Sequence, residues 1–304
     1  MPVITVGLDG SPESLAAADW AAREAAQQEA LLRLVHAEEP VVPVYAPLGG
    51  ISAPGVLAAQ RAWAAHLLRE TESRLALRRP DLRITAEETR QEAVPALLSA
   101  AEHSDLLVLG SRGLGTVTGF LVGSVALAVV ARTERPVVLV RAGERAEDEH
   151  LPDAGGAASD TTPYRDVVLG LDLENPADAV LEFAFEAARR RASGLRVVHG
   201  WNPAAVYGYG AALDSGLNAE LAQEARNGLS EALRPWRDKF PGVEISEQAV
   251  IGGAGRHLVH ASRDAALVVV GREQRHAPVG GRIGPVTHAV LQHASAPVAV
   301  VPHD

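Results

Sequence analysis

Short runs of Val, Leu and Ile alternate along the chain with long alanine-rich stretches. In the first half, the apolar runs predict strands at 3–8, 31–36, 82–87, 105–109 and 136–140. The alanine-rich stretches predict helices at 12–29, 55–79, 92–103 and 121–132. Strands that are apolar on both faces and alternate with helices indicate a parallel sheet with helices on both sides.

Two of the helix starts carry a local signal. Ser11-Pro12 in the first half and Asn175-Pro176 in the second each place a capping side chain directly before a proline. Such a side chain accepts a hydrogen bond from the first helical turn, where proline has no N–H group to leave unpaired. We therefore expect a helix to begin at each of these pairs.

The second half of the chain repeats the first. VGLDGSPESLAAADWAAREAAQQEALLRLVHA matches LGLDLENPADAVLEFAFEAARRRASGLRVVHG, with Asp9 and Asp172 163 residues apart. Further along, LLVLGSRG matches LVVVGREQ, with Gly110 and Gly271 161 residues apart. One length change therefore lies between LRLVHA and Pro80. A register this constant across widely spaced landmarks indicates a tandem duplication.

The repeat divides the chain into two domains and a connecting segment. Residues 142–164 have no apolar period and are rich in acidic residues, Gly, Ala and Thr, which is typical of a flexible linker. The sequence predicts one domain at 1–141 and another at 165–304. Each is expected to be an α/β domain with a doubly wound, five-stranded parallel sheet. Four acidic residues of the linker are expected to be solvated: Glu144, Glu147, Asp148 and Glu149.

Composition excludes several classes of protein. The chain has no cysteine, which excludes a disulfide scaffold, thiol catalysis and cysteine-ligated zinc, and fits a reducing compartment. The opening MPVITVGLDG has no basic residue and runs directly into a strand pattern, so we expect no signal peptide and a cytoplasmic protein. A net charge of −10 without a basic block disfavours nucleic acid and anionic membranes as partners. Lys239 is the only lysine and lies far from any glycine loop, which excludes Walker-type ATPase chemistry.

One uncharged stretch, residues 113–131, is long enough to be taken for a transmembrane helix. Four glycines and three hydroxyl residues crowd its first two-thirds. We interpret the stretch as a glycine-rich loop that leads into a short buried helix, because spans are usually richer in leucine and lack a turn-forming entry. The protein is therefore not expected to enter a membrane.

The ends of two predicted strands carry the residues that point to a ligand. In a doubly wound sheet, ligands bind beyond the carboxyl ends of the strands, where the winding reverses. Asp9 follows the first strand, and Gly110 follows the fourth and begins the spacing G-x2-G-x9-G-S, completed by Gly113, Gly123 and Ser124. The end of this motif opens a helix, whose first N–H groups attract an anion. A phosphate there, with a carboxylate nearby for ribose hydroxyls, describes a nucleotide.

These motifs resemble a known family. VGLDGS, LRLVHA and G-x2-G-x9-G-S followed by RPVVLVR are similar to the universal stress protein domain, specifically its ATP-binding branch. The resemblance covers nearly all of both copies, so the whole chain resembles a tandem universal stress protein. It implies an adenine nucleotide α hydrolase-like fold, with ATP, alone or with Mg²⁺, across the ends of strands one, two and four. It also implies a homodimer and an unidentified protein partner.

The resemblance assigns roles to residues of the first copy. Asp9 would bind the ribose side of the nucleoside, and the backbone of Ala37 would meet adenine. Gly110 and Gly113 would line the phosphates, with Arg112 as a neighbour. The residues that would hold the phosphates are Gly123, Ser124 and Val125.

The second copy keeps part of this pattern. Gln274 replaces the second glycine of the loop, and Pro285 replaces the phosphate-binding serine. We therefore expect weaker nucleotide binding in this copy. Its matching residues are Asp172, Gly200, Gly271 and Gly284.

Structural roles are open alternatives for the same residues. Each aspartate could only close a turn, and the glycines could only shape a strand–helix connection. His36 and His199 are expected to pack or hydrogen-bond at a strand end. His257 and His260 have no third ligand at zinc spacing and are expected to be solvated. Three of the four tryptophans have no stacking pattern and are expected in the core or an interface, namely Trp63, Trp201 and Trp236.

Three functions are compatible with these features. The leading hypothesis is an ATP-binding regulator of stress or dormancy that acts through nucleotide-dependent conformation or partner binding, without a catalytic apparatus. The alternative is a slow ATP-hydrolysing or nucleotidyl-transfer enzyme on the same fold. An H-x-G-H pair or a loop lysine would favour that enzyme, and the sequence has neither. The third is a scaffold that has lost its ligand.

Overall fold

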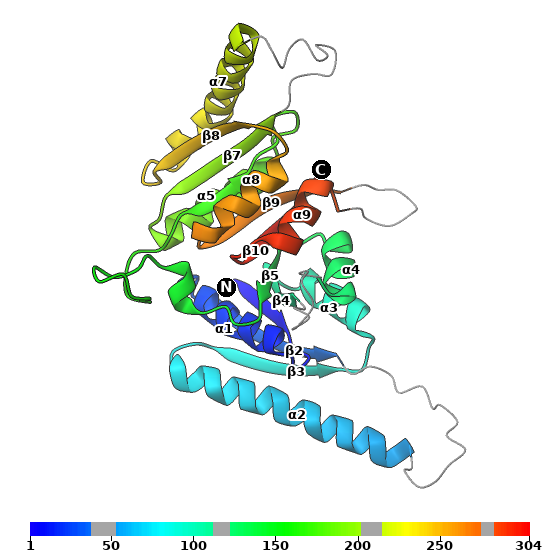
Figure 1. The fold of residues 1–304 in the computed structure, drawn as a ribbon. Helices are drawn as coiled ribbons and strands as arrows, with labels where there is room; N and C mark the ends of the chain where they lie inside the picture. Colours follow the sequence, from blue (N-terminus) through cyan, green and yellow to red (C-terminus); the bar gives the residue numbers. More distant parts are fainter. Residues whose placement is uncertain (38–52, 112–121, 202–214, 275–282) are drawn as a thin grey trace. The chain divides into compact units, whose positions relative to one another are not determined.

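The computed structural model describes residues 1–37, 53–111, 122–201, 215–274 and 283–304. It separates into two compact units, unit 1 at Met1–Arg145 and unit 2 at Ala146–Asp304. Each unit contains a parallel sheet with helices packed against it, as Figure 1 shows in colours that follow the sequence.

The sheet of unit 1 has five parallel strands in the order β3-β2-β1-β4-β5. Chain order and sheet order reverse between β1 and β4, which makes the carboxyl ends of these two strands the switch point of the winding. The strands are β1 (Val3–Gly7), β2 (Leu31–Ala37), β3 (Ile84–Thr89), β4 (Leu106–Ser111) and β5 (Val137–Arg141).

The helices of unit 1 cover both faces of its sheet. Because strand–helix–strand crossovers between parallel strands are right-handed, α1 and α2 share one face, and α3 and α4 share the other. The contacts agree, since α1 meets α2 and α3 meets α4. Their bounds are α1 (Pro12–Gln27), α2 (Ala53–Arg78), α3 (Ala93–Glu102) and α4 (Ser124–Arg132).

Unit 2 repeats this topology, with the strand order β8-β7-β6-β9-β10. Its strands are β6 (Val167–Gly170), β7 (Leu195–Trp201), β8 (Ile245–Ile251), β9 (Leu267–Glu273) and β10 (Val298–His303). Its described helices are α5 (Asp178–Arg191), α7 (Ser215–Lys239), α8 (Ala254–Ala261) and α9 (Pro285–His293), together with the short 3-10 helices η1 (Ala146–Glu149) and η3 (Ser262–Asp264).

The core of each unit lies between its sheet and its helices. Strands such as β1 and β4 are buried along nearly their whole length because both of their faces are covered. In α1, alanines let the helix approach the sheet closely, and Trp20 fills the remaining space with 1% of its surface exposed. In unit 2, Phe185 of α5 stacks on Trp236 of α7 and on Phe240, which directly follows α7, at centroid distances of 5.7 and 5.3 Å.

The predicted architecture is confirmed as an α/β fold with two doubly wound parallel sheets in tandem. The cap at Ser11 is also confirmed, because its hydroxyl accepts a hydrogen bond from the N–H of Ser14 at 3.2 Å. The start predicted at Asn175 is wrong, since α5 begins at Asp178. Gly10 turns the chain before α1 with φ +79°, a conformation that Leu173 at the matching position disfavours, and the second helix starts later.

The segment predicted as a linker makes local contacts. It contains η1, and His150 pairs with Tyr164 in an antiparallel bridge. Glu149 was expected to be solvated, and this is wrong because only 2% of its surface is exposed. The N–H of Arg165 donates to the carbonyl oxygen of Glu149 at 2.9 Å, which closes the segment on itself.

The apolar stretch at 113–131 yields a short helix, as predicted, in the form of α4. The glycine loop before it, at 112–121, lies outside the described residues. Within the described ranges, no helix combines the length and the apolar character that a membrane crossing requires.

Candidate functional site

Asp9 lies two residues after the end of β1, at the switch point of unit 1, and is exposed to solvent. Its carboxylate accepts hydrogen bonds from the backbone N–H and the hydroxyl of Ser11, at 3.0 and 2.5 Å. This turn fixes the side chain at the mouth of the sheet and joins it to the cap of α1. The carboxylate closes a turn, as the structural alternative held, and an exposed carboxylate in this position can still accept from ribose hydroxyls.

The carboxyl ends of β1 and β2 are joined by a histidine. Nδ1 of His36 lies 2.7 Å from the carbonyl oxygen of Leu8, and only 9% of the histidine is exposed. Ala37, the last residue of β2, follows it and is half-buried. The expected hydrogen bond at the strand end is therefore present, and it places the Ala37 backbone beside the end of β1.

Gly110, near the end of β4, is required by packing. A Cβ atom at this position would lie 2.7 Å from the backbone nitrogen of Ser14 and from the carbonyl carbon of Glu13. The start of α1 thus rests directly on β4. This contact brings Gly110, α1 and the turn that holds Asp9 together at one edge of the sheet. It also explains the glycine without a ligand.

The amino end of α4 is open to solvent. Its N-cap residue, Gly123, has no side chain that could accept from the first-turn N–H groups, and Ser124 and Val125 after it are exposed. Such an end carries positive partial charge and suits an anion. Arg112 and Gly113, the other predicted phosphate residues, lie outside the described residues.

One cation near the start of the glycine loop was missed in the sequence. Arg141, the last residue of β5, pairs in register with Ser111, the last residue of β4. Burial lowers the pKa of the Arg141 guanidinium from its ordinary value, and the negative charge of Glu144 opposes this shift. The guanidinium keeps its charge at neutral pH. Strand register, which the sequence alone does not give, places this charge at the same edge of the sheet.

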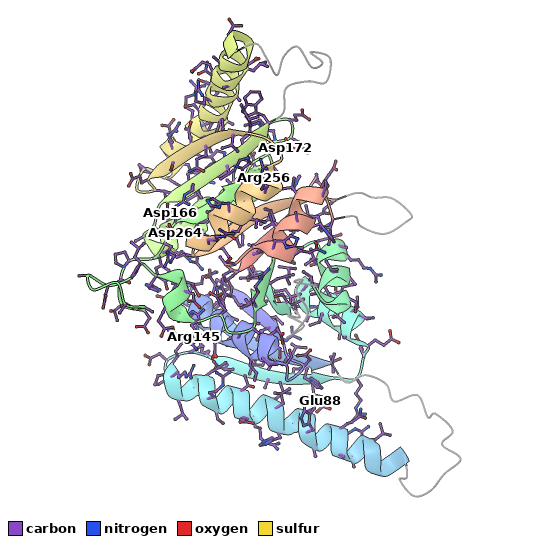
Figure 2. The ribbon with its side chains drawn as sticks, in the orientation of Figure 1. Glu88, Arg145, Asp166, Asp172, Arg256 and Asp264 are labelled. Atoms are coloured by element: carbon purple, nitrogen blue, oxygen red, sulfur yellow. The ribbon has the colours of Figure 1, made fainter. Side chains whose placement is uncertain are left out.

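The matching residues of unit 2 repeat part of this geometry. Asp172 accepts from the N–H of Glu174 at 3.0 Å, and Nδ1 of His199 lies 3.0 Å from the carbonyl oxygen of Leu171. Figure 2 labels Asp172, which follows β6, and Asp166, which precedes that strand. The aspartate–histidine framework therefore survives in the second copy.

The glycines of unit 2 differ in what surrounds them. A Cβ atom at Gly200 would lie 2.5 Å from the backbone nitrogen of Ala254, and one at Gly271 would lie 2.8 Å from Nε2 of His303. At Gly284 it would meet nothing within 4 Å. Gly284 caps α9, and Pro285 then occupies the first helical position. Unit 2 thus keeps a helix start at the matching place but lacks one backbone N–H donor there.

The most informative residue that the sequence analysis missed is Trp63 of α2. It was expected in the core or an interface, and the core is wrong because 49% of its surface is exposed. Its six-membered ring lies over Gly10, next to Asp9 in the chain. Within the described ranges, no three His, Cys, Asp or Glu side chains gather as a metal site, so the pair His257 and His260 has no third ligand there.

These features define the class of the protein. Two five-stranded parallel sheets, each wound in two directions from a central strand, form a tandem doubly wound α/β protein. The model of the universal stress protein family matches residues 1–141 and 163–302. The chain belongs to the universal stress protein family, and the resemblance found in its motifs is confirmed.

Relatives of similar length support this assignment. Universal stress protein Rv2005c of Mycobacterium tuberculosis is 31% identical over 300 residues, which cover 98% of this chain and 96% of the relative. Universal stress protein Rv2623 of the same organism is 31% identical over 302 residues, covering 98% and 95%. A crystal structure of a universal stress protein from Archaeoglobus fulgidus shares the fold, with a TM-score of 0.69 and 14% identity over 99% of this chain and 98% of that one.

Proposed function

We propose that this protein is an ATP-binding regulator whose nucleotide site lies in unit 1, at the carboxyl ends of β1, β2 and β4. The observation that carries the proposal is the pairing of two features in this unit. An exposed carboxylate, Asp9, stands at the switch point, and α4 opens with an exposed amino end. A nucleotide needs acceptors for ribose hydroxyls and donors for phosphate, and these features supply both.

Each part of the nucleotide has a counterpart in this proposal. The ribose hydroxyls donate to Asp9, and adenine meets the backbone at Ala37. The phosphates lie at Gly123, Ser124 and Val125, with Gly110, Gly113 and Arg112 along the loop. Mg²⁺ would arrive on the phosphate oxygens, since this ion keeps most of its waters and needs few protein ligands.

The proposed role is regulation by binding. Nucleotide occupancy would change the conformation or the choice of a protein partner, in a cytoplasmic homodimer that responds to stress or dormancy. Membership of the universal stress protein family supports this role. No catalytic group is assigned, and turnover of ATP is expected to be slow.

The experiment is a count of nucleotide in the native protein. A denaturing extract of gently purified protein is separated by chromatography, and the nucleotide is identified by mass and counted per chain. About one ATP per chain supports the proposal, whereas AMP or another reaction product supports the enzyme alternative. An empty protein that also fails to bind added Mg-ATP in a titration contradicts the proposal and supports a scaffold without ligand.

A further inference from the structure

Trp63 is held over the turn that carries Asp9. If Gly10 had a Cβ atom, that atom would lie 2.7 Å from Cζ2 and 3.1 Å from Cη2 of the indole. Gly10 also has φ +79°, which favours glycine independently of space. The turn therefore combines a left-handed backbone with a gap that the indole fills.

A second contact fixes the orientation of the indole. The rings of Trp63 and His36 meet edge to face, with centroids 5.5 Å apart and planes at 74°. His36 is itself held by the carbonyl oxygen of Leu8 and is 9% exposed, so it provides a rigid support. The indole is thus positioned by β1 and β2 together, while about half of the residue stays open to solvent.

We propose that Trp63 is the base-stacking residue of unit 1, whose indole face packs on the purine ring of the bound nucleotide. This inference rests on the proposed function, because the purine would reach the indole from a ribose held by Asp9. Aromatic faces bind bases by stacking with little dependence on hydrogen bonds. The supporting observation is position: the indole touches the residue after Asp9 and the residue before Ala37.

In the described part of α7, the position that matches Trp63 has no indole. The helices α2 and α7 end at Arg78 and Lys239, 161 residues apart, which aligns Trp63 with the exposed Glu224. A carboxylate has no aromatic face, so this position of unit 2 cannot stack on a base.

A neighbouring contact between the helix and the turn is kept in unit 2, but the leucine and the glycine that form it have changed places. A Cβ atom on Gly10 would lie 3.7 Å from Cδ2 of Leu67, whereas one on Gly228, the match of Leu67, would lie 3.5 Å from Cδ1 of Leu173. The leucine sits on the helix in unit 1 and on the turn in unit 2. Gly10 therefore leaves room for the indole beside the turn of unit 1. In unit 2, Leu173 occupies the matching space.

The test compares variants of the full-length, nucleotide-free protein in titrations with ATP and with inorganic tripolyphosphate, which has the phosphate chain but no base. Trp63→Ala is expected to weaken ATP binding by about five- to 150-fold and to leave tripolyphosphate unchanged. Trp63→Phe keeps an aromatic face and is expected to stay within about threefold of the original ATP affinity. Leu77→Ala removes another exposed apolar group of α2 and is expected to change neither titration.

The outcomes separate this inference from the proposed function. If the unmodified protein binds no ATP, the proposed function fails. If it binds ATP and Trp63→Ala binds ATP equally well, the stacking inference is wrong and the proposed function stands. If Trp63→Ala binds ATP and tripolyphosphate equally more weakly, stacking is also wrong, because the indole would then support the shape of the site rather than contact the base. Should Trp63→Ala melt at a much lower temperature, tryptophan fluorescence decides: ATP must quench emission in the unmodified protein and not in Trp63→Phe.

Discussion

Nδ1 of His36 and the main-chain carbonyl oxygen of Leu8 lie 2.7 Å apart, which joins the carboxyl ends of β2 and β1. Since a carbonyl oxygen only accepts, the histidine carries its proton on Nδ1. His199 and Leu171 repeat the contact in unit 2 at 3.0 Å. This hydrogen bond is kept in both copies, although only unit 1 keeps the full set of predicted phosphate residues. Its first role is therefore to hold the strand ends together.

Replacing His36 by Ala is expected to lower stability. The lost hydrogen bond contributes about 0.5–1.5 kcal/mol, and the cavity left by the buried ring adds to that. Thermal melts of the full chain measure the effect, with His199→Ala as the matched change in unit 2. Because His199 is more exposed than His36, its substitution should cost less. Equal melting temperatures of the unmodified protein, His36→Ala and His199→Ala would show that the histidine hydrogen bond contributes nothing to stability.

Replacing Gly110 by Ala is expected to destabilise unit 1, because the added methyl group would lie 2.7 Å from the backbone of α1. Backbone cannot rotate away as a flexible side chain can, and overpacking of this kind costs about 1–3 kcal/mol. Gly284→Ala is the control, since a Cβ atom there meets nothing within 4 Å and the residue has φ −63°. Denaturant unfolding of both variants checks the contrast. A Gly110→Ala protein as stable as the control would mean that α1 can move off β4.

Replacing Asp9 by Ala, or Gly123 by Glu, is expected to remove nucleotide while the fold is retained. Asp9 is exposed at the sheet mouth, and a glutamate at Gly123 would put a negative charge where phosphate is proposed. Loss of a hydrogen bond to a charged group weakens binding by about 1.5–3 kcal/mol, or roughly ten- to 150-fold. A fluorescent ATP analogue measures affinity, and a thermal melt checks the fold. Unchanged affinity in either variant contradicts the site.

The architecture was predictable from the sequence because buried parallel strands and amphipathic helices carry local patterns. The strand predicted at 136–140 is β5, Val137–Arg141, and the helix predicted at 55–79 is α2, Ala53–Arg78. The start of α5 was predicted too early because the turn before α1 depends on the left-handed backbone of Gly10, which Leu173 at the matching position disfavours. Local signals of this kind identify an element better than they define its first residue.

Sequence alone could predict those residues of the candidate site that lie at the end or the start of a helix or strand. Asp9 and Gly123 each mark the end or start of an element, so position along the sequence places them. Trp63 and Glu149 depend on packing between distant segments, and neither residue has a neighbour in the sequence that reveals its partner or its burial. Arg141 belongs with them, because only strand register places it beside Ser111.

Occupancy is expected to be asymmetric, with tight binding of ATP in unit 1 and weak or no binding in unit 2. Gln274 puts a side chain where the first copy has glycine, and Pro285 removes a hydroxyl and an N–H from the start of α9. Two lost hydrogen bonds to phosphate reduce affinity by about a hundredfold or more.

Isothermal titration of ligand-free protein measures this asymmetry. One tight site per chain is expected in the unmodified protein and none in Asp9→Ala, while Asp172→Ala is expected to keep the tight site. Pro285→Ser restores both donors at an exposed helix start and is expected to strengthen binding in unit 2 without altering unit 1. Two equivalent sites per chain, or the loss of only half the signal in Asp9→Ala, would instead establish unit 2 as a working site. Its framework of Asp172 and His199 would then be sufficient for nucleotide without the serine.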